Sequence, residues 1–424
     1  MKMLKIELLT ACAIGAMTVA TPAFAQDKSV SVVHYWTSGG EAAAIAAVKE
    51  AFEAQGGTWI DQGVAGGGGD GHDQVLRSRT LAGDAPGAAI PKASDAVEWA
   101  NAGYIADLEA VAAENKWDQN LPAAFLPSLK VDGKYIAIPL FVHRFDTMYA
   151  NARLLAENGI EMPATWDEFN TAADRLLAAG ITPLAHGGQS WQDEILFEAV
   201  VMGVGGADFF RKALVELDQE ALRSDAMLKS FDQFRRLRGY VDANFSGRDW
   251  NLASGMVANG EAAFQIMGDW AKGEFSAAGL DLGREILCSG SPRNTPEGFS
   301  YVVNSLSFFT KQPNQHQATP GQELLAKVLL EPEVQLAANL AKGSVPALTG
   351  LDLSTYDQCS IDTAGFLAAA DADGKLVPSV QGGTVNVASV RGAVIDAATA
   401  FFNSDMSSEE GVTMLADALQ NATE

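Results

Sequence analysis

The chain has little of three things: cysteine, basic residues and long apolar runs. Its 424 residues include three cysteines, and its 29 lysines and arginines face 53 aspartates and glutamates, for a net charge of −24. Such a chain repels phosphate backbones, so we predict no nucleic-acid partner. After the amino terminus no run approaches the roughly 20 apolar residues of a membrane helix. Five histidines without a cysteine cluster argue against a metal-binding transport protein, and we predict neither metal nor cofactor.

Residues 1–25 have the pattern of a secretory signal peptide. Lys2 and Lys5 precede an apolar centre from Leu8 to Ala20, and Ala23-Phe24-Ala25 matches the small-x-small cleavage pattern. The apolar centre is too short to span a membrane. We therefore predict a periplasmic protein whose mature chain starts at Gln26.

Two cysteines remain after the signal peptide, Cys288 and Cys359. In an oxidising compartment an isolated pair more often bonds than stays free, and no Cys-x-x-Cys spacing suggests a metal. We predict a disulfide between them. Cys12 lies well before the cleavage site, which favours a free protein over a lipid-anchored one.

The mature chain has the size and pattern of a two-lobed α/β protein. About 400 residues with a hydrophobic fraction of 48% favour two lobes over one core. Short β-like runs alternate with helical patterns, and Thr165 with Glu168 predicts a capping box. We expect strands near 30–33, 58–64, 88–90, 135–140, 181–185, 261–267 and 301–309, and helices over 42–52, 73–81, 95–102, 193–241 and 392–419.

The loop after the first strand carries two aromatic rings and a carboxylate, Tyr35, Trp36 and Glu41. It lies at the carboxyl end of a predicted parallel strand, where open α/β sheets bind ligands. A core aromatic pair beside a surface glutamate is the alternative.

The run Gly66 to Gly69 lacks the Lys-Ser/Thr ending of a phosphate loop. Asp70 with its neighbours matches no calcium-loop spacing. We interpret the run as a flexible loop whose backbone passes near a ligand.

Later loops repeat this chemistry. Lys92 lies between a predicted strand and helix, where it is either a ligand contact or a solvated surface charge. Gln189 and Trp191 precede a helix, and we favour ligand contact over helix capping. Two later segments, around Trp250 and Trp270, again combine glycine, an acidic residue and tryptophan. The remaining candidate residues are Trp250, Asp269, Trp270, Asn304 and Lys342.

Taken together, these motifs resemble the glucose-type sugar-binding proteins of bacterial ABC importers, within extracellular solute-binding protein family 1. The resemblance spans nearly the whole mature chain. It rests on the ordered segments Tyr35-Trp36-Thr37-Ser38-Gly39-Gly40-Glu41, Val64-Ala65-Gly66-Gly67-Gly68-Gly69, Gly187-Gly188-Gln189-Ser190-Trp191-Gln192, Met267-Gly268-Asp269-Trp270 and Lys342-Gly343-Ser344-Val345-Pro346. It implies two α/β lobes that close on a sugar and present it to a membrane permease. The family's sugar contacts would fall on Trp36, Glu41, Lys92, Trp270, Asn304 and Lys342.

Four positions depart from the family pattern. Tyr35 stands where a second tryptophan is expected, and Asn304 where an aspartate is expected. Gly382 takes the place of an expected ligand-binding histidine, and Asp146 stands where an asparagine is expected. These departures predict altered specificity and leave a different monosaccharide, a substituted sugar and a polyol open.

The predicted function is reversible sugar capture by a monomer, without catalysis. We place the first lobe at 26–137 plus 301–340 and the second at 138–300 plus 341–424. A secreted glycoside hydrolase is the alternative, which needs two carboxylates roughly 5 to 10 Å apart across a cleft. No such pair stands out in the sequence.

Overall fold

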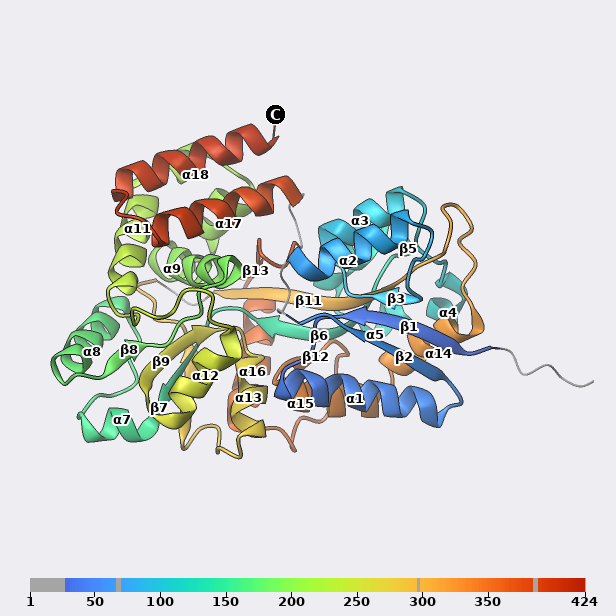
Figure 1. Cartoon of the computed structure of the whole chain (residues 1–424), viewed down its shortest axis with the longest axis horizontal. Helices are drawn as coiled ribbons and strands as arrows, with labels where there is room; N and C mark the ends of the chain where they lie inside the picture. Colours follow the sequence, from blue (N-terminus) through green and yellow to red (C-terminus); the bar gives the residue numbers. More distant parts are fainter. Residues whose placement is uncertain (1–26, 66–69, 296–297, 384–387, 424) are drawn as a thin grey trace, which may run out of the picture.

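The computed structural model describes residues 27–65, 70–295, 298–383 and 388–423. The predicted signal peptide, Cys12 and the glycine run 66–69 lie outside these residues. Within the described ranges the chain forms two α/β lobes, with long strands running between them (Figure 1).

Short strands dominate the sheets. In chain order they are β1 (Ser29–His34), β2 (Thr58–Gly63), β3 (Ala88–Ala89), β4 (Lys130–Val131), β5 (Lys134–Tyr135), β6 (Ile138–Arg144), β7 (Thr147–Asn151), β8 (Thr182–Leu184), β9 (Ala262–Met267), β10 (Ile286–Gly290), β11 (Phe299–Phe308), β12 (Val345–Pro346) and β13 (Leu376–Pro378).

Helices cover both sheets. They are α1 (Gly39–Ala54), α2 (Asp70–Leu81), α3 (Ala93–Asn101), α4 (Glu109–Glu114), α5 (Trp117–Asn120), α6 (Leu126–Leu129), α7 (Ala152–Glu157), α8 (Trp166–Ala178), α9 (Ser190–Phe210), α10 (Gln219–Leu222), α11 (Asp225–Arg238), α12 (Trp250–Asn259), α13 (Ala271–Ala277), α14 (Pro320–Leu329), α15 (Pro332–Lys342), α16 (Gln358–Ala372), α17 (Ala388–Phe402) and α18 (Ser408–Thr423). A short 3-10 helix, η1 (Ala123–Phe125), and a short π-helix, η2 (Arg211–Val215), complete the set.

Each lobe is built on its own sheet. The first sheet has the order β12-β6-β11-β3-β1-β2, with β13 paired to β11, and β1 is parallel to β2 and β3. The second has the order β10-β7-β9-β8. Parallel strands need crossover connections, and α1 and α2 supply them in the first lobe. The carboxyl ends of β1 and β3 therefore lie at one edge of the first sheet.

Strands β6 and β11 run antiparallel between the lobes (Figure 1). The sequence predicted a strand that ends near Pro139, but β6 continues to Arg144. Pro139 pairs with Ser305, where the register shifts between Asn304 and Ser305. A proline without an N–H is tolerated at such an irregularity because no regular ladder bond is lost. The prediction was wrong because Leu140, which has no partner between Phe141 and Pro139, forms a bulge on β6, and the strand continues past it.

Apolar side chains form one large core in each lobe and a smaller cluster built mostly on β9, α12 and α13 of the second lobe. Trp36 and Phe141 belong to the first core, and the small cluster contains Trp191, Trp250 and Trp270. Val142 and Val345, near the predicted lobe limits, pack in the first core. The limits 26–137 plus 301–340 and 138–300 plus 341–424 stay a prediction.

Two local predictions are confirmed. Cys288 on β10 forms a disulfide with Cys359 on α16, with Cα atoms 6.1 Å apart. Thr165 and Glu168 form the capping box of α8, since each side chain accepts a hydrogen bond from the other residue's N–H. The helical pattern predicted over 193–241 is interrupted by η2 and the short α10.

Candidate ligand-binding cavity

A cavity lies beside β11 and receives residues from both lobes. The space between its walls, counting open solvent at its mouth, is about 590 Å³. Its lining residues are Tyr35, Glu41, Pro91, Lys92, Phe145, Trp191, Trp250, Trp270, Val302, Val303, Asn304, Lys342, Gln381 and Gly382.

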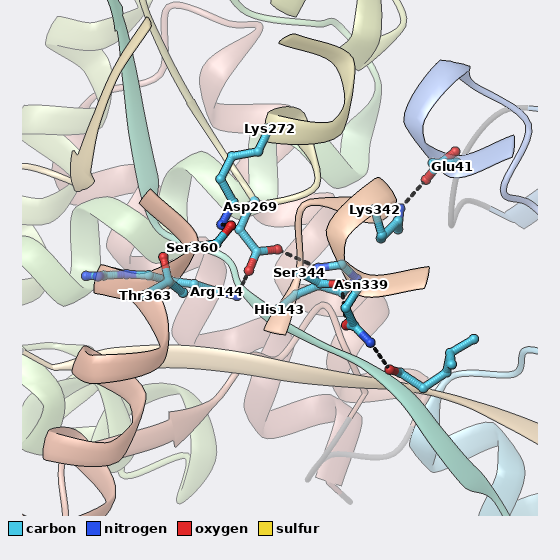
Figure 2. A network of polar contacts seen from close by, with 12 residues as sticks. Glu41, His143, Arg144, Asp269, Lys272, Asn339, Lys342, Ser344, Ser360 and Thr363 are labelled. Atoms are coloured by element: carbon cyan, nitrogen blue, oxygen red, sulfur yellow. Dashed lines mark hydrogen bonds and ion pairs between the residues drawn. The ribbon is translucent and has the colours of Figure 1, made fainter. Parts of the chain in front are cut away.

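The first lobe contributes a buried ion pair to the cavity. Glu41 lies in the first turn of α1, and Lys342 is the last residue of α15. Their Oε1 and Nζ atoms are 2.6 Å apart, with side chains 7% and 3% exposed (Figure 2). Each charge suits its helix end, because an acid is favoured at the amino terminus and a base at the carboxyl terminus. The pair offers both acceptors and donors to a ligand hydroxyl.

Lys92 adds a second ion pair on the same side. It occupies the N-cap position of α3, after β3, and its Nζ lies 3.3 Å from Oδ2 of Asp73. Burial raises the pKa of Asp73, but the hydrogen bond with His72 and the charge of Lys92 outweigh it and hold that pKa below its ordinary value. The Asp73 carboxylate therefore stays charged beside Lys92.

The second lobe contributes four aromatic rings. The Trp270 ring centroid lies 6.3 Å from that of Trp191, 6.4 Å from that of Trp250 and 5.1 Å from that of Phe145. The planes of Trp250 and Trp270 meet at 88°, and those of Trp191 and Trp270 at 46°. These rings form a corner centred on Trp270 rather than a flat platform.

A loop after β13 brings Gln381 and Gly382 to the cavity. Glu198 on α9 holds this loop from behind, because its Oε1 accepts hydrogen bonds from the N–H groups of Val380 and Gln381 at 2.8 and 3.1 Å. The Ser379 hydroxyl also donates to it at 3.1 Å. Gly382 lies where the resemblance led us to expect a histidine, and it leaves that part of the lining without a side chain.

Most of the predicted site residues line this one cavity. They come from separate segments of both lobes, so their convergence is a property of the fold. These residues are Tyr35, Glu41, Lys92, Trp191, Trp250, Trp270, Asn304 and Lys342.

Trp36 does not line the cavity. Its side chain is 1% exposed and packs edge-on against Phe141 in the first core, with ring centroids 4.8 Å apart. The ring that reaches the cavity from this loop is Tyr35. Burial raises the pKa of Tyr35, so its hydroxyl stays protonated and can donate a hydrogen bond.

Asp269, the residue before Trp270, also lies outside the lining. One carboxylate oxygen contacts Nδ1 of His143, and the other accepts the N–H of Arg144 at 3.1 Å (Figure 2). Burial lowers the pKa of His143, and the Asp269 charge opposes this effect. Asp269 is thus held by β6 and fixes the start of the loop that carries Trp270.

Gln189 and Asp146 make their contacts within the second lobe. Gln189 bonds to Asp249 and Trp191, while the buried Asp146 pairs with Arg144 and Arg293. Phe145 is a lining residue that sequence reasoning missed. Its position directly after a strand between the lobes was the available signal.

The described residues hold no cluster suited to a metal ion. In the ranges 27–65, 70–295, 298–383 and 388–423, no three His, Cys, Asp or Glu side chains converge on one point. Over the same ranges, no helix has the length and apolar character needed to cross a bilayer.

Comparisons with known proteins agree with this architecture. Residues 36–335 match the family described as "Bacterial extracellular solute-binding protein". The "Probable sugar-binding periplasmic protein" of Rhizobium meliloti (strain 1021) is 40% identical and covers 98% of this chain and 99% of its own. The protein of the same name from Brucella suis biovar 1 (strain 1330) is 41% identical, with 99% coverage of both.

A solved structure shows the same fold at lower sequence identity. A "Chitin oligosaccharide binding protein" is 20% identical, has a TM-score of 0.76, and covers 93% of this chain and 98% of its own. The family match, the full-length relatives and the two-lobed fold lead to one conclusion. This chain belongs to the bacterial extracellular solute-binding protein family.

Proposed function

We propose that this protein captures a sugar reversibly between its lobes and delivers it to the membrane permease of an ABC importer. The observation that carries the proposal is the division of the cavity into one aromatic wall and one hydrogen-bonding wall. A pyranose has an apolar C–H face that can lie on Trp270, and hydroxyls that can bond to Glu41 and Lys342. The names of the full-length relatives support a sugar as the ligand.

The ring geometry favours a monosaccharide or a closely related solute. Trp191 and Trp250 are inclined to the central Trp270 by 46° and 88°, so they form walls at its sides. A linear oligosaccharide would need rings lying along one direction. A buried polar group that finds no hydroxyl partner on the ligand costs about 1–3 kcal/mol of binding free energy. This cost gives the first-lobe wall its selectivity between sugars.

A glycoside hydrolase is not supported by the cavity. Such enzymes use two carboxyl groups across the cleft. Among the described lining residues Glu41 is the only acid, and it is paired with Lys342. We propose binding without catalysis, by a monomeric periplasmic protein that is exported by its signal peptide and binds no nucleic acid.

Calorimetry against aldoses, sugar acids, polyols and linear oligosaccharides tests the proposal. We expect one aldose or close derivative to bind with micromolar affinity, roughly −8 kcal/mol, and longer oligosaccharides to bind at least tenfold more weakly. No heat with any sugar would contradict sugar capture. Preferred binding of an oligosaccharide would contradict only the size assignment, and turnover of a glycoside would contradict the absence of catalysis.

A further inference from the structure

Gln189 lies at the junction of the two helices that carry Trp191 and Trp250. It is the N-cap residue of α9, and Asp249 is the N-cap residue of α12. Neither side chain caps its own helix. Instead, the Gln189 Nε2 donates to Oδ1 of Asp249 at 2.6 Å. An aspartate cap is worth about 1 kcal/mol, so this bridge takes the place of an ordinary stabilising contact.

The other end of the Gln189 side chain contacts the cavity wall from behind. Its Oε1 accepts from Nε1 of Trp191 at 3.0 Å and from Nε2 of Gln192 at 2.8 Å. An indole N–H can only donate and a carboxylate can only accept, so both ends of the Gln189 amide are assigned. Because its N–H is bonded to Gln189, Trp191 offers the cavity its ring rather than a donor.

The backbone around Gln189 is held as tightly as its side chain. Gly188 donates its N–H to the Arg248 carbonyl at 3.1 Å, and a Cβ on Gly188 would lie 2.4 Å from the nitrogen of Gly247. Arg248 also donates to the carbonyl of His186 at 3.0 Å. The two loops therefore form one rigid frame with the Gln189 amide at its centre.

We propose that Gln189 is a positioning residue for sugar selectivity. It fixes the angles of Trp191 and Trp250 against Trp270 by bridging their helices, and it does so without touching the ligand. The sequence predicted direct contact, but Gln189 is not among the lining residues. The inference rests on the proposed function, and it identifies which side chain sets the shape of the aromatic corner.

An exchange of amide and carboxylate tests the bridge. Gln189→Glu places a carboxylate against that of Asp249 and breaks the bridge. We expect the sugar affinity to fall about tenfold, which corresponds to the loss of roughly one hydrogen bond. We also expect the ratio of affinities for epimeric sugars to change. Asp249→Asn keeps an acceptor and should stay within about twofold. The double variant Gln189→Glu/Asp249→Asn restores a donor–acceptor pair and should recover the affinity and the ratio.

A ligand-free measurement separates this inference from the proposed function. The indole N–H resonance of Trp191, assigned with Trp191→Phe, should shift in Gln189→Glu, where a carboxylate replaces its amide acceptor, and should stay near its wild-type position in Asp249→Asn. Unchanged sugar selectivity in a folded Gln189→Glu, or a loss that the double variant does not recover, would overturn the positioning role; the second result indicates direct sugar contact. If wild-type protein binds no sugar, the proposed function fails, and an unshifted resonance then overturns the bridge as well.

Discussion

The two walls of the cavity handle charge in opposite ways. The first lobe pairs its charges, Glu41 with Lys342 and Asp73 with Lys92. The second lobe presents rings, and its buried acids Glu194 and Glu198, one turn apart on α9, do not line the cavity. Paired charges provide directed hydrogen bonds to hydroxyls, and rings provide contact area and shape. We therefore expect the first-lobe wall to distinguish sugars by the positions of their hydroxyls, and the second-lobe wall to distinguish them by the shape of the ring face.

Breaking the first-lobe ion pair gives the largest expected effect. Lys342→Met leaves the Glu41 carboxylate buried without its partner, so the free energy of unfolding should fall by about 3–5 kcal/mol. Urea unfolding measures it. The double variant Glu41→Gln/Lys342→Met should recover most of this stability but not sugar affinity. If the single and double variants have the same free energy of unfolding, the unpaired Glu41 carboxylate is not the cause of the lost stability.

Removing the central ring tests the second-lobe wall. Trp270→Ala takes away the ring at the corner of the aromatic wall, and we expect a loss of about 2–3 kcal/mol, or roughly 30- to 150-fold in affinity. Trp270→Phe keeps a flat ring and should lose less. Titration calorimetry on variants with a retained melting transition measures both. Wild-type affinity in Trp270→Ala would remove the ring from the site.

A pH-dependent effect is expected at Glu194, which is buried on α9. Burial, and then the charge of Glu198, raise the pKa of Glu194 well above its ordinary value. Folded protein therefore keeps a proton that the unfolded chain releases, and stability falls as the pH rises above the ordinary glutamate pKa. Glu194→Gln removes the part of this dependence that comes from Glu194.

Its stability advantage over wild type should be small near pH 4 and grow toward pH 8, by at most about 1.4 kcal/mol per pH unit. Thermal unfolding across this range measures it. The exposed Glu409→Gln is the matched control and should follow wild type at every pH. A Glu194→Gln advantage that is the same at all pH values would contradict the assignment.

The smallest effect concerns the loop between β1 and α1. Tyr35→Phe removes a single hydroxyl from the cavity, so we expect a loss of about 1 kcal/mol, or roughly fivefold in affinity. Tyr104→Phe, outside the lining, is the control. If only some epimeric sugars lose affinity, the Tyr35 hydroxyl bonds to a sugar hydroxyl at one particular position. No change with any sugar would limit Tyr35 to apolar contact.

Local sequence patterns predicted elements well where the cause of the structure was local. The capping box at Thr165 and Glu168 depends on residues three apart, and the strand and helix around the loop of Tyr35 follow from β-branched residues, glycines and an apolar period. The Cys288–Cys359 disulfide followed from the count of cysteines and their compartment. The end of β6 was missed because a bulge at Leu140, visible only in the pairing of β6 with β11, lets the strand continue past Pro139.

The sequence by itself determined which loops line the cavity, because their residue types and their places after strands can be identified from the chain alone. The tertiary structure decided which side chain in each loop faces the cavity. Tyr35 and Trp36 are adjacent, yet Phe141 on a distant strand draws Trp36 into the core and leaves Tyr35 at the cavity. Likewise His143 holds Asp269, and Asp249 holds Gln189. Such choices depend on partners far away in sequence, and only packing brings those partners together.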